Sequence, residues 1–385
     1  MRHPKPLRIF FDANPLLGES RTGVGHYTHQ VITELSRAGD NDVEIIIHYF
    51  SFLNRKRSAE GRMPHAPNIR FRPCWFMPAK VFTGLRKLGI NIPLEILLMG
   101  RVDAAIFPNY FTYASIAGVK IIPTIHDLSF IKYPETVEAR NLLNMRSQVP
   151  ISLRRAAAVL TQSVTVKTEL MEQYNIPDEK IVVNYPVSDI PNDGRDESLS
   201  SYLKRHINKP YLLFISSIEP RKNIPTLINA YIQLPKKYRD MYSLVLAGGP
   251  GWKNTDILDL IKEKKAEGYD IRYIGYVSDE DRRLLFMNAR LFVMPALYEG
   301  FGMTPIEASQ CGLPSVVSDI PVFRELASAT DLTFFSPITD ASAFSEKISQ
   351  ELSKQKTAPR YNPDVFAWGK SAQRLLRALI AITSK

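Results

Sequence analysis

The hydrophobic and polar positions of this chain follow two alternating patterns. Short apolar runs rich in β-branched residues, such as 8–14 and 43–50, are typical of buried strands, whereas 27–39 has apolar residues at helical spacing. The same reasoning predicts strands at 104–109 and 120–127. Because strands that alternate with helices form parallel sheets covered by helices, we expect an α/β fold.

A stretch rich in Pro, Asp, Asn and Ser, residues 184–198, interrupts this alternation as a linker does. The alternation then starts afresh. It predicts strands at 211–216, 242–249, 271–277, 290–296 and 314–319, and helices at 224–234, 256–268, 279–289 and 304–312. A length of 385 residues also suits two domains, so we expect a connector near 190–208.

Composition narrows the class of protein. The two cysteines cannot form a disulfide framework, which favours a reducing compartment such as the cytoplasm. The first apolar run is too short for a signal peptide, and no run approaches the roughly 18 residues of a membrane-spanning helix. Residues 55–101 hold ten Lys or Arg against two Glu, so most of the net charge of +10 lies there. Nucleic acid, anionic lipid, a phosphorylated substrate or a merely solvated surface would each account for this charge.

Two motifs follow predicted strands of the first half, at the sheet edge where ligands of open α/β sheets bind. Gly23 and Gly25 let the backbone approach a ligand, and the next helix offers N–H groups to an anion. Such glycines are also common in plain turns. His126 and Asp127 end another strand segment. The histidine is suited to a sugar hydroxyl or a developing charge, and a satisfied structural histidine is the alternative.

Two further motifs follow strands of the second half. Arg221 and Lys222 lie where a helix begins, and their donors and charge suit a diphosphate that gains charge as it departs. A solvated basic pair is the alternative. In YEGFGMTPIEA, Glu299 lies on a loop and Glu307 in the next helix. A carboxylate accepts two hydroxyl hydrogen bonds at once, which fits the paired hydroxyls of a sugar.

The same stretch also has a structural interpretation. Thr304, Pro305 and Glu307 match a capping box, with threonine at N-cap, proline at N1 and glutamate at N3. This interpretation leaves Glu299 and the glycines on both sides of Phe301 unexplained. The spacing E-x7-E with GFG inside it is far more specific than either glutamate alone.

Residues 275–326, with SIEPRKN at 217–223 and the Gly23–Gly25 loop, resemble the retaining glycosyltransferases of GT-B fold that carry E-x7-E, in particular family 4-like mannosyl- and rhamnosyltransferases. The resemblance implies two Rossmann-like domains facing each other across a cleft. The N-terminal acceptor domain would span 1–190 and be completed by a C-terminal helix at about 364–385. The nucleotide-sugar donor domain would span 208–355.

The resemblance also implies roles for individual residues. The residues with implied catalytic roles are His126, Arg221, Lys222 and Glu299. The residues implied to bind the donor are Gly23, Gly25, Asp127, Tyr276, Val277, Gly300, Phe301, Gly302, Met303, Thr304 and Glu307. In this assignment Glu307 takes the ribose, the basic pair takes the diphosphate, Glu299 and His126 contact the transferred sugar, and the base lies near Tyr276. Many family members have Gly-Arg in place of Ser216-Ser217, and Arg221 is a candidate substitute for that arginine. The basic pair makes a catalytic metal unnecessary, so we expect neither a metal nor another cofactor.

The predicted function is retaining hexosyl transfer from a nucleotide-sugar, first GDP-mannose, to a glycan acceptor of bacterial surface polysaccharide such as lipopolysaccharide O-antigen. A UDP-sugar donor and a non-catalytic nucleotide-sugar binding protein are the alternatives. Further expected partners are a lipid-diphosphate carrier of the acceptor and an anionic membrane surface. Nucleic acid is not expected, because the sequence has no recognisable binding module. We expect the protein to be cytoplasmic and, more specifically, to lie peripherally at the inner face of the cytoplasmic membrane.

Overall fold

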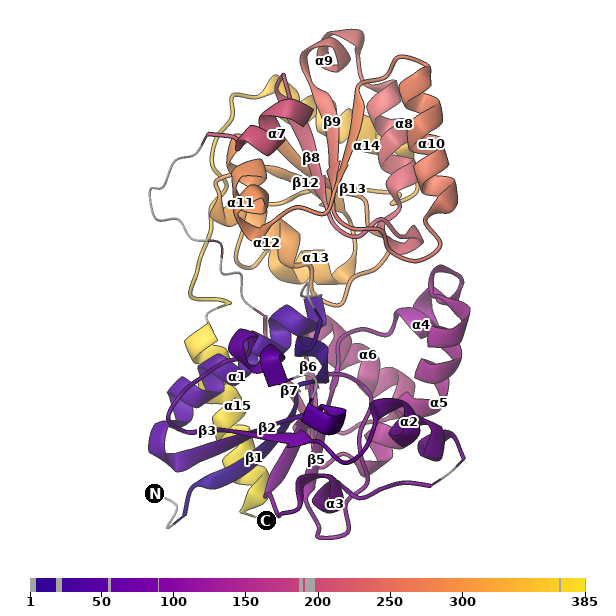
Figure 1. Ribbon diagram of the computed structural model, residues 1–385. Coiled ribbons are helices and arrows are strands. Elements are labelled where there is room, and N and C mark those ends of the chain that lie inside the picture. The colour runs from indigo at the N-terminus through magenta and orange to yellow at the C-terminus, as the bar shows by residue number, and fades with distance from the viewer. Residues whose placement is uncertain are drawn as a thin grey trace. The chain divides into compact units, whose positions relative to one another are not determined.

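The structure is a computed structural model that describes residues 5–18, 23–54, 57–88, 90–186, 190, 198–366 and 368–384. The chain divides into two compact units (Figure 1). The first comprises 1–127, 143–186 and 367–385, and the second comprises 128–142 and 187–366. Residues 128–142 thus belong with the second unit, although the sequence analysis assigned all of 1–190 to one domain.

The first unit is built on a parallel sheet with the strand order β3-β2-β1-β4-β5-β6-β7. Its strands are β1 (Leu7–Asp12), β2 (Val43–Phe50), β3 (Ile69–Cys74), β4 (Ala104–Phe107), β5 (Lys120–Ile125), β6 (Val159–Thr161) and β7 (Ile181–Val183). Its helices are α1 (Gly23–Gly39), α2 (Ala79–Lys87), α3 (Leu94–Leu98), most of α5 (Ala139–Arg155), α6 (Val164–Tyr174) and α15 (Trp368–Thr383).

The last helix, α15, packs in the first unit although it ends the chain. It lies beside α1 (Figure 1). Leu375 and Leu379 are buried in the same core as Ile32 and Leu35 of α1. The Ser371 hydroxyl also donates to the carbonyl of Tyr185, at 3.2 Å. Apolar burial on this scale, at roughly 1.5–3 kcal/mol for each fully buried Leu or Ile, fixes the helix to this unit.

The second unit has a parallel sheet with the order β10-β9-β8-β11-β12-β13. Its strands are β8 (Tyr211–Ile215), β9 (Ser243–Ala247), β10 (Ile271–Gly275), β11 (Leu291–Met294), β12 (Ser315–Ser318) and β13 (Thr333–Phe335). Its helices are α4 (Ser129–Lys132), α7 (Ser201–His206), α8 (Ile224–Gln233), α9 (Lys236–Met241), α10 (Thr255–Ala266), α11 (Asp279–Asn288), α12 (Met303–Gln310), α13 (Pro321–Leu326) and α14 (Ala341–Ser353).

The strand order reverses once in each sheet. In the second unit the chain runs outward from β8 to β10, returns to β11 beside β8, and continues outward to β13. In the first unit the corresponding point lies between β1 and β4. Loops that leave adjacent strands at such a switch point diverge to opposite faces of the sheet, which opens a crevice for a ligand at their carboxyl ends.

Two predicted helix starts are wrong. The first helix begins at Gly23, four residues before the predicted Tyr27, because its buried face already includes Gly25 in the first turn. The helix of the E-x7-E stretch begins at Met303, with Gly302 in place of Thr304 as N-cap. Residues 19–22, which precede the first helix, and most of the predicted linker, at 187–189 and 191–197, lie outside the described residues.

Candidate active site

The motifs of the second half converge at the switch point of the second sheet. The loop after β8 contains a short 3-10 turn, Pro220–Lys222, and so carries Arg221 and Lys222. The loop after β11 carries Glu299. Because β8 and β11 are hydrogen-bonded neighbours, these side chains meet although the sequence separates them by 77 residues.

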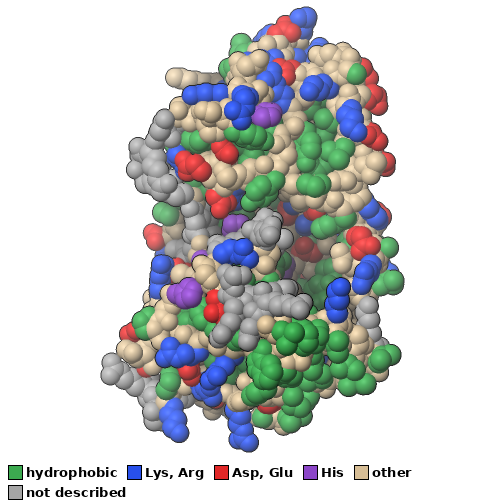
Figure 2. Space-filling model, viewed as in Figure 1, with side chains coloured by type: hydrophobic (Ala, Val, Ile, Leu, Met, Phe, Trp, Pro, Cys, Tyr) green, Lys and Arg blue, Asp and Glu red, His purple; other side chains and the backbone are tan. Residues whose placement is uncertain are grey.

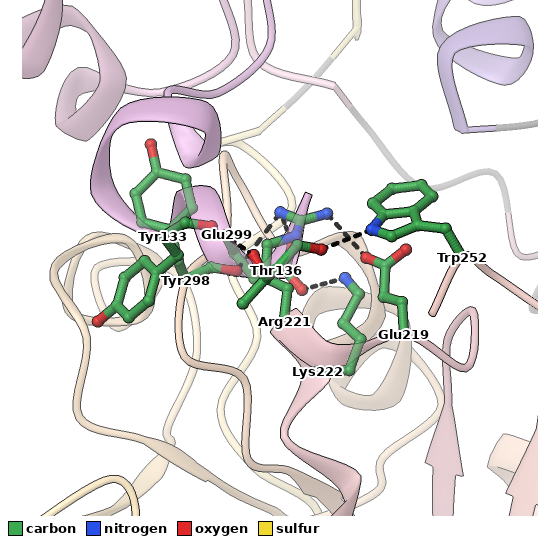
Figure 3. A network of polar contacts seen from close by, with 8 residues as sticks. All are labelled: Tyr133, Thr136, Glu219, Arg221, Lys222, Trp252, Tyr298 and Glu299. Atoms are coloured by element: carbon green, nitrogen blue, oxygen red, sulfur yellow. Dashed lines mark hydrogen bonds and ion pairs between the residues drawn. The ribbon is translucent and has the colours of Figure 1, made fainter. Parts of the chain in front are cut away.

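Four charged side chains form one buried network there (Figure 3). The Lys222 ammonium donates to one carboxylate oxygen of Glu299, and Arg221 Nη1 reaches the other oxygen at 3.5 Å. Arg221 Nη2 donates to Glu219 at 3.1 Å. Lys222 and Glu299 are 7% and 8% exposed, and Glu219 is 1% exposed. Two cations are thus balanced by two carboxylates, as buried charges require.

This network holds each group in a fixed direction. The ammonium has three N–H donors and the guanidinium five, so carboxylate pairing uses only part of the donor capacity of these side chain types. Sequence reasoning missed Glu219, because its partner choice depends on how the loop folds. The only signal for it was its place in SIEPRKN.

A glycine loop supports the network from the neighbouring strand. After β9, Gly248 has φ +136°, and a Cβ on it would lie 1.9 Å from the carbonyl oxygen of Ser216. A Cβ on Gly251 would lie 2.8 Å from the carbonyl oxygen of Ile218 and 3.0 Å from Cβ of Glu219. Only glycine allows this close approach. The strand predicted at 242–249 included Gly248, and nothing in the sequence indicated this role for the glycines after β9.

The capping-box prediction is wrong. Gly302 is the N-cap of α12, with φ +94°, and no side chain caps the helix. A Cβ on Gly302 would lie 2.6 Å from the ring of Phe323, so the position requires glycine on both counts. The first N–H groups of a helix have no intrahelical partner, and at the start of α12 no side-chain oxygen caps them.

Glu307 pairs with an arginine that the sequence analysis did not select. Arg282 Nη1, from α11, donates to Glu307 Oε1 at 2.8 Å, and Glu307 is 2% exposed. Tyr276 and Val277 follow β10, directly before α11. Val277 is buried, whereas Tyr276 is 61% exposed. An exposed aromatic ring beyond the carboxyl end of a strand is suited to stacking on a base.

The predicted residues of the first unit lie around the ends of β5 and α1. His126 Nε2 donates to the carbonyl of Pro108 at 2.6 Å, and its ring lies edge-on to Tyr27, with 5.3 Å between centroids. Burial lowers the pKa of His126, against the carbonyl of Pro108 and the charge of Asp127. The ring is therefore neutral near pH 7 with its proton on Nε2. Gly25 is buried in the first turn of α1.

Comparison with known proteins decides the family. Residues 199–364 match the family described as glycosyl transferases group 1, and residues 21–190 match Glycosyltransferase Family 4. The O-antigen chain mannosyltransferase B of Escherichia coli is 30% identical over 357 residues, which cover 90% of this chain and 91% of the relative. This chain is a family 4 glycosyltransferase. The O-antigen chain mannosyltransferase RfbU of Salmonella typhimurium is 26% identical, over 80% of this chain and 82% of its own length.

Solved structures give the same fold for this glycosyltransferase. The crystal structure of Anabaena HepE in complex with UDP and glucose matches with a TM-score of 0.62 and 17% identity, over 98% of this chain and 97% of that one. WaaG, a glycosyltransferase involved in lipopolysaccharide biosynthesis, matches with a TM-score of 0.60 and 14% identity, over 98% of each chain. The GT-B fold, with two Rossmann-like domains, is confirmed.

Neither a metal site nor a membrane-spanning helix is present among the described residues. No group of three or more His, Cys, Asp or Glu side chains within the described ranges could hold a metal ion. In the same part of the chain, no helix is both long and apolar enough to cross a membrane.

Proposed function

We propose that this glycosyltransferase transfers mannose, with retention, from GDP-mannose to a glycan acceptor of a bacterial surface polysaccharide. The observation that carries the proposal is the buried network of Lys222, Arg221, Glu299 and Glu219 at the switch point of the second sheet. The named relatives, both O-antigen mannosyltransferases, support the choice of sugar and pathway. A UDP-sugar is the alternative donor.

Each part of the donor has a matching group in the second unit. Glu307 accepts the ribose hydroxyls, and Tyr276, beside Val277, stacks on the base. Arg221, Lys222 and the N-terminus of α12, at Met303 and Thr304, hold the diphosphate. The sugar lies against Glu299 and the backbone of Gly300, Phe301 and Gly302. As in the family resemblance, we assign His126 to the sugar and Asp127, Gly23 and Gly25 to donor binding from the first unit.

The chemistry asked of these residues is positioning and charge stabilisation. The bond between the anomeric carbon and the diphosphate oxygen breaks, and the acceptor oxygen bonds to that carbon on the same face. The acceptor proton passes to the departing diphosphate. Lys222 and Arg221 stabilise the charge that gathers on this leaving group, an effect worth about 3–4 kcal/mol for one well-placed donor in other enzymes. We propose that no metal or other cofactor takes part.

A non-catalytic binding protein is the less favoured alternative. A site without catalytic duty has no need of a buried ammonium, which could be replaced by apolar packing at little cost in stability. Both Lys222 and Glu299 are present and paired. Turnover of a bound donor separates the two functions.

We also propose that the first unit docks on an anionic membrane that carries a lipid-linked acceptor. Hydrophobic side chains gather on this unit in Figure 2, and the exposed ones on α2, on α3 and in nearby loops are Val81, Leu88, Ile90, Ile96, Met99 and Ile116. Exposed basic residues in the same part of the sequence are Arg70, Arg72, Lys80 and Arg101. Apolar insertion and basic attraction together suit an anionic lipid surface.

The test of the donor is a calorimetric titration of the whole protein with GDP-mannose, other GDP-sugars and UDP-sugars. A ligand that binds only the folded state also raises the unfolding temperature, so thermal unfolding gives an independent readout. We expect GDP-mannose to bind most tightly and to raise the unfolding temperature. Tighter binding of a UDP-sugar would show that the donor is a UDP-sugar and not GDP-mannose. Binding of a donor without any turnover in the presence of acceptor would favour the non-catalytic alternative.

A further inference from the structure

Arg282 holds the glutamate that we assign to the ribose. Its Nη1 donates to Glu307 Oε1 at 2.8 Å, from α11 to α12. The nearest competing carboxylate, Asp279, lies 3.6 Å from Nη2 and is mostly exposed. Arg282 itself is 28% exposed at its side chain, whereas Glu307 is buried. The guanidinium is therefore committed to Glu307, and the looser contact to Asp279 adds little.

The other acidic residues at the start of α11 do not compete for Arg282. Glu280 pairs with Arg283 at 2.9 Å, and Asp281 accepts hydrogen bonds from Ser200 at 2.6 Å and Ser278 at 3.0 Å. The acidic residues Glu280 and Asp281 therefore have other partners, and Arg282 is directed at Glu307. That arginine lies six residues after the exposed ring of Tyr276.

This pair is not accounted for by stability alone. Burying a carboxylate with a cation is often no more stabilising than apolar packing of the same volume. Within the described residues, Nε of Arg282 is also buried without a hydrogen-bond partner, a feature that lowers stability. An arrangement that lowers stability in this way is expected where it serves a ligand.

We propose that Arg282 is a positioning residue for recognition of the nucleotide's ribose, an inference that rests on the proposed role of Glu307. The guanidinium occupies one acceptor direction of the carboxylate and fixes its rotation. A carboxylate has about four acceptor directions, so enough remain for two adjacent hydroxyls. Arg282 thereby determines how strongly the site distinguishes ribose from a deoxyribose.

The test measures that discrimination directly. Calorimetry gives the ratio of dissociation constants for a nucleoside diphosphate and its 2′-deoxy and 3′-deoxy analogues, using GDP and UDP series and keeping the tighter one. We expect the wild type to favour the ribose form about tenfold or more, the value of a hydrogen bond to a charged acceptor. Arg282→Gln should lower this ratio several-fold, and Arg282→Lys, which keeps the charge but not the planar fork, should lower it less.

Two further variants separate this inference from the proposed function. Asp279→Asn removes only the looser contact of Arg282 and should keep the wild-type ratio. Glu307→Gln should abolish the discrimination whatever Arg282 does. If Glu307→Gln keeps the wild-type ratio, or if no nucleoside diphosphate binds, the proposed ribose role of Glu307 fails and the inference fails with it.

If Glu307→Gln loses the discrimination while both Arg282 variants keep it, only the inference is overturned. Thermal unfolding of each variant establishes that it is folded. Should Arg282→Gln not fold, the Arg282→Lys ratio decides, because an unchanged ratio in that variant contradicts the proposal. Loss of overall affinity without a change in the ratio would show a merely structural role and would also contradict it.

Discussion

The ammonium of Lys222 and the carboxylate of Glu299 form a buried ion pair that joins the loops after β8 and β11. Each side chain was predicted to face the substrate, and the structure shows that each also faces the other. Glu299 therefore holds the Lys222 ammonium in one direction before any ligand arrives. Such preorganisation is the usual source of electrostatic stabilisation in enzymes, because little reorganisation is then needed during the reaction.

Loss of this pair should separate stability from activity. Lys222→Met leaves the buried Glu299 with a weakened set of partners, so we expect a loss of roughly 3 kcal/mol in the free energy of unfolding. Adding Glu299→Gln should restore most of it, because no unpaired charge then remains. Transfer activity should fall by about 10²-fold or more in both proteins. Denaturant unfolding and initial rates measure the two effects, and recovery of activity in the double variant would show that the pair is structural only.

Replacement of Gly302 should cost both stability and nucleotide binding. Gly302→Ala meets both an unfavourable φ of +94° and the ring of Phe323. Gly268 has the same φ with no atom within 4 Å of an added Cβ, so Gly268→Ala is a matched control. We expect the control to lose about 1–2 kcal/mol and Gly302→Ala about 1–3 kcal/mol more, with weaker nucleotide binding. Equal losses in the two variants would rule out the predicted clash.

His48 should make stability depend on pH below neutrality. It is fully buried, and burial lowers its pKa to about 4 from an ordinary value of 6.5. Between these two pH values His48 is protonated in the unfolded chain but neutral in the folded protein. The free energy of unfolding therefore falls as pH drops from about 6.5 to about 4, by roughly 3 kcal/mol in total. His48→Asn should flatten this dependence, while Asp12, whose pKa is raised, remains in both proteins. Parallel stability curves for the two proteins would contradict the assignment.

Membrane docking should depend on the exposed apolar side chains of the first unit. We expect binding to anionic vesicles that is released by salt, since each basic residue contributes about 1 kcal/mol near such a surface. Leu88→Ser with Ile90→Ser should weaken it, whereas Met241→Ser, at an exposed site of the second unit, should not. Vesicle sedimentation measures the bound fraction. Equal binding to neutral and anionic vesicles, or no binding at low salt, would contradict the docking proposal and show that this region is an ordinary solvated surface.

Arg86 is a poor choice for that experiment, although it belongs to the basic segment 55–101. Its guanidinium stacks over the ring of Phe111, with 4.7 Å to the centroid, and donates to Gln148. Burial lowers its pKa. Charge reversal there would disturb packing as well as surface charge. Arg55 and Lys56 of the same basic segment lie outside the described residues.

The fold could be predicted from sequence because parallel strands buried on both faces read as continuous apolar runs. The whole of β8, Tyr211–Ile215, is buried, as its composition indicated. The start of α12 could not be predicted in the same way. The local motif favoured Thr304 as N-cap, but Phe323, from the next helix, fixes the position of Gly302. A contact distant in sequence overrode a local preference.

The candidate site could also be predicted only in part. The residue types and their positions after strands favoured Glu299, Glu307, Arg221 and Lys222 as site candidates, and the structure brings Glu299, Arg221 and Lys222 together. Their partners did not follow from the sequence. Arg282 lies in a run of charged residues, Asp279 to Arg283, and nothing local distinguishes it from Arg283, which pairs with Glu280 instead.

The most direct test of the central claim is proton NMR of the transfer reaction, with GDP-α-mannose and an α-mannosyl oligosaccharide as acceptor. The account predicts that the new glycosidic bond has the α configuration, that one GDP is released for each bond formed, and that Lys222→Met slows transfer by about 10²-fold or more. A β-linked product, or transfer that proceeds undiminished in Lys222→Met, would contradict it.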